Sequence, residues 1–306
     1  MRFFDVDEKI RKDTKIVIFG IPWDYLTSID LPNSSNAPER IRDVTNDIGW
    51  TSELGENITN FKIVDVGDIP IEETNVTKNL KTIQDFIKKI YLQNEKIIPV
   101  MIGGDHFCTY PVIKTVAETI YEKKKFGVLL FDAHLDFYQE WDKGVYSHAT
   151  VSHRVYDLEY FNKDNLLIAG VRDIDIPELE IARNEKIEYL SAYKLIDGIE
   201  IYIKSIIDFF KKSEINSLYI SIDIDTLDPS IAPGTGFALP GGFSYRELWK
   251  VLKELANNFE IIGFDLVEVA PNLDLDNKMT CNLAAKIIIE LISFISNNRE
   301  FEYDER

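Results

Sequence analysis

The sequence predicts an α/β fold of three layers, in which helices cover both faces of a mostly parallel sheet. Short runs rich in Ile, Val, Leu and Phe recur along the 306 residues, and segments with helical spacing and mixed charge lie between several of them. Continuous apolar runs are typical of strands that are buried on both faces. Alternation of such strands with helices is typical of a parallel sheet.

The expected strands are, in chain order, residues 15–20, 61–66, 96–102, 126–132, 165–170, 217–223 and 260–267. The expected helices are residues 76–94, 199–212 and 245–258. The apolar stretch 287–295 is interrupted by Glu290 and Ser293 and falls short of the roughly 20 residues of a membrane helix, so we expect a buried helix face there. Because no repeat or Pro/Ser-rich linker divides the chain, we expect a single domain over residues 1–306.

Acidic residues outnumber basic ones, 52 to 34, which gives a formal charge of -18. Such a charge repels nucleic acid and anionic membrane surfaces, so we expect neither as a partner. It is consistent with solubility alone or with attraction of a cationic substrate. Two cysteines, Cys108 and Cys281, cannot build a disulfide framework, and the N-terminal residues lack the apolar core of a signal peptide. We therefore expect a cytoplasmic protein.

Polar clusters follow three of the expected strands. Residues 103–106 come after the third strand, residues 132–136 after the fourth and residues 223–225 after the sixth. Functional groups of open α/β sheets collect at the carboxyl ends of the strands. We therefore expect the chemistry of the protein to lie in these clusters.

The clusters contain metal-ligand residues at the period of extended chain. Asp132, His134 and Asp136 alternate, as do Asp223 and Asp225, so each set points to one face. A single Asp at a strand end is often a helix cap or turn residue, but three clusters together favour a metal site. With His106 the set has two imidazoles and four carboxylates, enough for two divalent ions and suited to manganese, with cobalt or nickel as substitutes.

The chain resembles the ureohydrolase family, which contains arginases and agmatinases. The resemblance rests on Gly-Gly-Asp-His at 103–106, Asp-Ala-His-Leu-Asp at 132–136, and the segments 221–229 and 232–236. Weaker similarity at residues 20–24 and 37–42 extends it over most of the chain.

The resemblance implies a three-layer α/β/α fold, two manganese ions and homo-oligomers, usually trimers or hexamers. It also implies that Asp132 and Asp223 bridge the two metals. One ion would take His106, Asp132, Asp136 and Asp223, and the other Asp132, His134, Asp223 and Asp225.

The family motifs also imply catalytic and substrate-binding residues. Asp136 would orient the attacking hydroxide and relay a proton, and His148 would act as an outer proton shuttle. Glu268 would bind the guanidinium group through charge-assisted hydrogen bonds, and Thr235 would also contact the substrate. The expected reaction cleaves a guanidino compound to urea and an amine.

The segment 137–147 predicts which guanidino compound is used. It is mainly aromatic and acidic, so it would repel a carboxylate and accept an ammonium group through Glu140, Asp142 or aromatic faces. This favours agmatine, cleaved to putrescine, over arginine. The other interpretation is a solvated acidic loop whose aromatic residues pack inward.

Three departures from the family pattern leave other substrates open. They are Phe107 after the first motif, His153-Arg154 after His148, and residues 26–36, each expected to reshape the mouth of the pocket. Aminopropylagmatine, guanidinobutyrate and arginine are the alternative substrates. A deacetylase-like hydrolase and a non-catalytic metal-binding homologue are the alternative functions.

Overall fold

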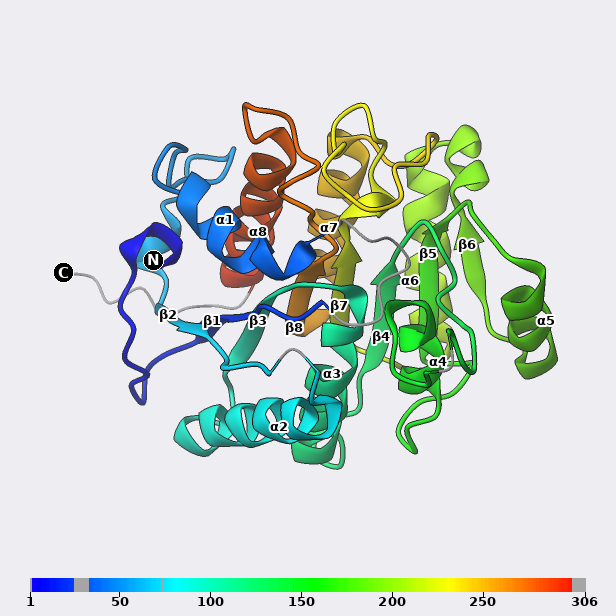
Figure 1. The fold of residues 1–306 in the computed structure, drawn as a ribbon, viewed down its shortest axis with the longest axis horizontal. Coiled ribbons are helices and arrows are strands. Elements are labelled where there is room, and N and C mark those ends of the chain that lie inside the picture. The colour runs from blue at the N-terminus through cyan, green and yellow to red at the C-terminus, as the bar shows by residue number, and fades with distance from the viewer. Residues whose placement is uncertain (1, 25–32, 73, 143, 299–306) are drawn as a thin grey trace.

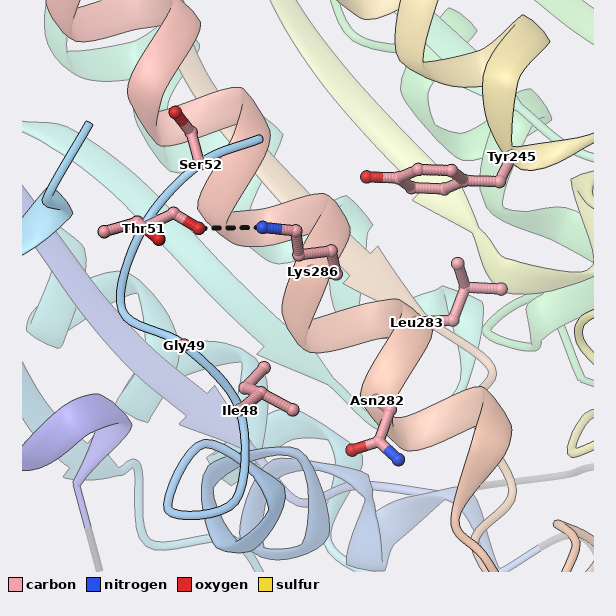
Figure 2. Close-up of a pocket in the computed structure, with 8 residues that line it drawn as sticks. All are labelled: Ile48, Gly49, Thr51, Ser52, Tyr245, Asn282, Leu283 and Lys286. Carbon is pink, nitrogen blue, oxygen red and sulfur yellow. Dashed lines mark hydrogen bonds between the residues drawn. The ribbon is translucent and has the colours of Figure 1, made fainter. Parts of the chain in front are cut away.

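The protein is described from a computed structural model in which residues 2–24, 33–72, 74–142 and 144–298 are placed. Within these residues a single eight-stranded sheet has the order β2-β1-β3-β8-β7-β4-β5-β6, and every strand pair is parallel (Figure 1). The α/β/α prediction is confirmed. The single domain over residues 1–306 stays a prediction.

The strands are β1 (Ile16–Ile21), β2 (Ile63–Asp68), β3 (Ile98–Gly103), β4 (Gly127–Phe131), β5 (Leu166–Val171), β6 (Tyr189–Ser191), β7 (Ser217–Asp223) and β8 (Glu260–Val267). The helices are α1 (Ala37–Val44), α2 (Val76–Gln93), α3 (Thr109–Ile120), α4 (Val151–Tyr156), α5 (Ile176–Glu185), α6 (Ile199–Lys212), α7 (Tyr245–Asn258) and α8 (Met279–Asn298). Short 3-10 turns join several of them. Each expected strand and helix is present, and β6 and four of the shorter helices are additional.

Alternating side chains of the strands build two separate cores, one on each face of the sheet. In β1, Ile16 and Ile18 enter the core shared with α1, α6, α7 and α8. Val17 and Phe19 enter the opposite core, shared with α2, α3, α4 and α5. Because helices cover both faces of the sheet, most strand residues are apolar, as in β1, whose six residues are all buried (Figure 1).

The last helix is long and apolar enough to cross a membrane by length and composition alone. Its residues 279–297 are 78% buried in this structure, as in the core helix of a soluble protein. The apolar stretch 287–295 is therefore one part of a 20-residue helix, α8, which packs against α1 and α7.

The polar clusters follow three of the four neighbouring strands at the centre of the sheet. In the order β3-β8-β7-β4 these strands end side by side (Figure 1). The register pairs Phe131 with Ile222 and Asp223 with Val267, so the residues that follow these strands meet at one edge. The fold therefore brings together segments that are far apart in the sequence.

Candidate metal centre

The first cluster gathers around His106, which follows β3. Its Nδ1 atom lies 2.8 Å from Asp132 Oδ2 and 3.3 Å from Asp136 Oδ2, both after β4. Asp223 Oδ2, at the end of β7, is 3.4 Å away. These are the four residues that the resemblance assigns to one metal ion, and all four side chains are buried.

The second cluster gathers around His134 and shares Asp132 with the first. His134 Nδ1 lies 3.3 Å from Asp132 Oδ1 and 3.1 Å from Asp225 Oδ2. Asp132 thus turns one oxygen to each histidine. Asp223 joins the second cluster through its own Oδ1, which accepts a hydrogen bond from Asp225 N at 2.8 Å.

Backbone N–H groups hold one oxygen of several ligand carboxylates and leave the other for the cluster. Asp132 Oδ1 accepts from His134 N at 2.7 Å, and Asp225 Oδ1 accepts from Ala133 N at 3.0 Å. The latter bond ties the end of β4 to the turn after β7. The Oδ2 atoms of Asp132 and Asp223 face His106, and that of Asp225 faces His134. Asp132 Oδ1 faces His134 in addition to accepting from its backbone.

The residues fit a pair of divalent ions. His106 Nδ1 and Asp132 Oδ2 are 2.8 Å apart and buried, yet neither has a hydrogen bond to any group in the described part of the chain. Such orphaned buried atoms are costly unless another group, such as a cation, binds them. Mixed imidazole and carboxylate donors suit manganese, cobalt or nickel.

Electrostatics point the same way. Burial and the neighbouring Asp132 carboxylate raise the pKa of Asp136 to about 8. Burial works to lower the pKa of His106, but Asp132, Asp136 and Asp223 outweigh it and raise that pKa well above its usual value. The cluster therefore retains protons where a cation would otherwise supply positive charge.

Glu268 extends the anionic site beyond the ligand residues. It follows β8, is half-buried, and its Oε1 accepts a hydrogen bond from His106 N at 2.7 Å. Burial and the nearby Asp105 carboxylate raise the pKa of Glu268 well above its usual value. A carboxylate in such surroundings is stabilised by a bound cation.

This constellation agrees with comparisons to known proteins. A family model described as "Arginase family" matches residues 14–293. The chain belongs to the arginase family. It is therefore a hydrolase of that family, and the resemblance drawn from the motifs is confirmed.

Relatives within the arginase family differ in the substrates that their names indicate. The chain is 31% identical to an agmatinase of Bacillus cereus, over 92% of each protein. It is also 31% identical to a mitochondrial arginase of Medicago truncatula, over 91% of this chain and 81% of that one. The solved structure of agmatine ureohydrolase of Thermoplasma volcanium superposes with a TM-score of 0.82 at 26% identity, covering 97% and 94% of the two chains.

The other two residues that the family motifs single out, His148 and Thr235, lie in segments held by hydrogen bonds. His148 is half-buried in the turn before α4, with Nδ1 3.3 Å from Ser147 Oγ. Thr235 is buried, and the adjacent Gly234 N donates to Thr280 Oγ1 on α8 at 2.8 Å. Their roles toward a substrate stay predictions.

Several aromatic residues of the 137–147 segment pack against the protein. Phe137 is fully buried, and Tyr138 OH donates to Asp175 Oδ2 at 2.6 Å. The Trp141 ring lies 4.7 Å from that of Tyr138. This matches the interpretation with aromatic residues turned inward and weakens the case for aromatic faces as an ammonium site.

The acidic members of this segment, Glu140 and Asp142, are exposed in the structure. Substrate selection by these two carboxylates stays a prediction.

The positions that depart from the family pattern have structural roles. Phe107 is fully buried, and its ring lies 5.5 Å from that of Tyr110. His153 is buried, with its ring 4.8 Å from that of Phe137. Of the segment 26–36, residues 26–32 lie outside the described residues.

Sequence reasoning missed two features near the centre. Glu178, buried at the start of α5, accepts hydrogen bonds from Phe137 N at 3.2 Å and Asp175 N at 3.1 Å, and so anchors the chain just after Asp136. Phe237 is 40% exposed, and its ring lies 5.5 Å from that of His134. The capping pattern Asp-x-x-Glu at 175–178 could have predicted the role of Glu178 at the start of α5.

Proposed function

We propose that this protein is a two-manganese hydrolase that cleaves agmatine to urea and putrescine. The observation that carries the proposal is the pair of His/Asp clusters that share Asp132, with the Glu268 carboxylate beside them. Arginase-family membership supplies the class of reaction.

Each side chain has a physical role in this proposal. When bound, the divalent ions supply Lewis acidity and an activated water. Glu268 pairs with the planar guanidinium group and orients it. Asp136 would orient the activated water and relay a proton to the departing amine, and His148 would exchange that proton with solvent.

Agmatine is favoured by charge. Agmatine has an ammonium-type cation and no carboxylate, and the segment after Asp136 contributes the exposed acids Glu140 and Asp142. The chain as a whole has a formal charge of -18, which attracts cations. Equal identity to an agmatinase and an arginase leaves this choice to the site itself.

The proposal includes the setting of the enzyme. We place it in the cytoplasm as a single-domain subunit of a trimer or hexamer, without nucleic-acid or membrane partners. Size-exclusion chromatography with light scattering measures the assembly directly.

A urea-release assay tests the function. The protein is stripped of metal with a chelator, then reloaded with manganese, cobalt or nickel and given agmatine, arginine, guanidinobutyrate or aminopropylagmatine. We expect no urea from the stripped protein, restoration by manganese, and a kcat/KM for agmatine at least about tenfold above that for arginine.

The other outcomes separate the alternatives. Full activity after exhaustive chelation would contradict the metal-dependent reaction. Preference for arginine or guanidinobutyrate would contradict the substrate but keep the reaction. Metal binding without urea release from any of the four compounds would indicate a non-catalytic homologue or a different hydrolase.

A further inference from the structure

The second ring nitrogen of His106 faces a buried hydroxyl network and not the metal cluster. His106 Nε2 lies 3.0 Å from Ser221 Oγ on β7. On the neighbouring strand β8, Asp265 accepts a hydrogen bond from Ser221 Oγ at 2.6 Å. All three side chains are fully buried, and the strand register pairs Ser221 with Asp265. The sheet itself therefore fixes this chain of contacts.

Three hydroxyl groups surround the Asp265 carboxylate. Besides Ser221, Thr109 Oγ1 donates to Oδ1 at 3.0 Å and Tyr219 OH donates to Oδ2 at 2.8 Å. An ionised carboxylate only accepts hydrogen bonds, and 2.6 Å is within the range of a charge-assisted O–H···O⁻ bond. Thr109 Oγ1 also lies 3.2 Å from Ser221 Oγ, but Thr109 donates its own proton to Asp265, and the contact of Ser221 with Asp265 is much shorter. The single proton of the Ser221 hydroxyl is thus committed to Asp265.

This commitment decides which nitrogen of His106 carries the proton. With its own proton on Asp265, Ser221 Oγ can only accept from His106 Nε2. A neutral His106 then bears its proton on Nε2 and keeps a lone pair on Nδ1. Nδ1 is the atom that faces Asp132, Asp136 and Asp223.

We infer that Asp265, acting through Ser221, is a positioning residue that fixes the metal-binding tautomer of His106 and thereby the affinity of the first metal site. The inference rests on the two-metal site of the proposed function. It assigns a role to a carboxylate that touches neither metal nor substrate. Ligating histidines commonly need such a partner on the second nitrogen, and its loss typically weakens metal binding about 10- to 100-fold.

Calorimetric titration of the chelated protein with manganese tests the inference. In Asp265→Asn the amide can donate to Ser221, which frees the serine proton for His106 Nε2 and favours the wrong tautomer. We expect one of two manganese ions to bind about 10- to 100-fold more weakly, and the other to change much less. Ser221→Ala should do the same, whereas Ser221→Thr keeps the hydroxyl and should restore binding.

Tyr219→Phe is the matched control. It removes one hydroxyl from the same buried carboxylate, but from the oxygen that does not contact Ser221. We expect both ions to bind as in the wild type. If Tyr219→Phe weakens binding as much as Asp265→Asn, the network is merely structural and the inference is overturned.

Histidine NMR gives a readout that a merely structural role would not move. The chain has only four histidines, so imidazole ¹⁵N labelling resolves His106 in the protein loaded with diamagnetic zinc. We expect a slowly exchanging Nε2–H in the wild type and in Tyr219→Phe, and fast exchange in Ser221→Ala. Wild-type affinity for both ions in Asp265→Asn and Ser221→Ala would overturn the inference and leave the proposed function intact. A wild type that binds fewer than two ions would overturn both.

Discussion

Asp136 and Glu268 share an uncommon backbone conformation, with φ values of 50° and 62°. Both follow central strands, and hydrogen bonds hold both in place: Ser152 N donates to Asp136 O at 3.1 Å, and Glu268 N donates to Gly104 O at 2.8 Å. Non-glycine residues in the left-handed region cost about 1–3 kcal/mol and persist where the surroundings enforce them. The backbone conformation that orients these two carboxylates thus lowers the stability of the folded protein.

Replacing Asp136 separates its charge from its backbone conformation. Asp136→Asn and Asp136→Ala both remove the carboxylate, so each should weaken manganese binding at least about tenfold. Asn tolerates the left-handed conformation and Ala does not, so the chelated Ala variant should be less stable than the Asn variant by about 1 kcal/mol. Urea unfolding at pH 9 and manganese titration measure the two effects.

At pH 9 the chelated Asp136→Asn protein should be at least as stable as the wild type. The carboxyl of Asp136, with its pKa near 8, is then ionised beside Asp132, and the amide removes that repulsion. A clear loss of stability would show that the Asp136 charge is not in conflict with its neighbours.

Glu268→Gln should damage catalysis without damaging the metal site. Gln keeps an acceptor for His106 N but loses the charge that pairs with guanidinium. We expect kcat/KM for agmatine to fall about 100-fold, equivalent to about 3 kcal/mol, with two manganese ions still bound. Metal analysis of the same sample provides the control. Loss of an ion would contradict the prediction and indicate that Glu268 helps to bind metal.

Asp223→Ala should be far more harmful to metal binding than Asp228→Ala. Asp223 faces His106 within the ligand cluster. Asp228 accepts from Ser230 N and Gly241 N, as expected of a turn residue. Manganese content after desalting should fall by at least one ion per chain in Asp223→Ala and stay at the wild-type level in Asp228→Ala. Thermal unfolding compares the stability of Asp228→Ala with that of the wild type. Equal manganese content would contradict the assignment.

Glu178 should make the stability of the protein depend on pH. Burial raises its pKa to about 7 from an ordinary value of 4.5, so the folded protein holds a proton that the unfolded chain loses between these values. Its contribution to stability is complete below about pH 4.5 and falls by about 3 kcal/mol as pH rises to about 7. Glu178→Gln lacks this dependence.

Urea unfolding of the chelated wild type and Glu178→Gln at several pH values measures the difference. The free energy of unfolding of Glu178→Gln minus that of the wild type should rise with pH up to about pH 7 and then stay constant. The exposed Glu180→Gln on the same helix is the control. A difference that is the same at every pH would contradict the raised pKa.

The sequence predicted those elements whose pattern was strong on its own. The bounds of β7, β8, α6 and α7 agree with the expected ranges, because long apolar runs and clear helical spacing mark them. The three residues of β6 are too few for a periodic signal, and α5 does not separate apolar from polar residues into two faces. Such elements depend on tertiary packing.

The ligand cluster was predictable because its spacing is local, whereas its supports were not. Asp and His residues that alternate at strand ends have side chains that point to the same face. The contact of Ser221 with Asp265 depends on the pairing of β7 with β8, which no single segment encodes. Asp265, an acidic residue within the apolar run of β8, nevertheless indicated that this strand has a role besides packing in the core.

Distribution of the ligand residues over the central strands links metal release to unfolding. Central strands are generally the last parts of a domain to open, and their amides exchange with solvent most slowly. Ligand residues at or just after the ends of β3, β7 and β4 should therefore keep their places when an edge strand frays. Manganese retention should therefore depend on the central strands of the sheet and not on the edge strands β2 and β6.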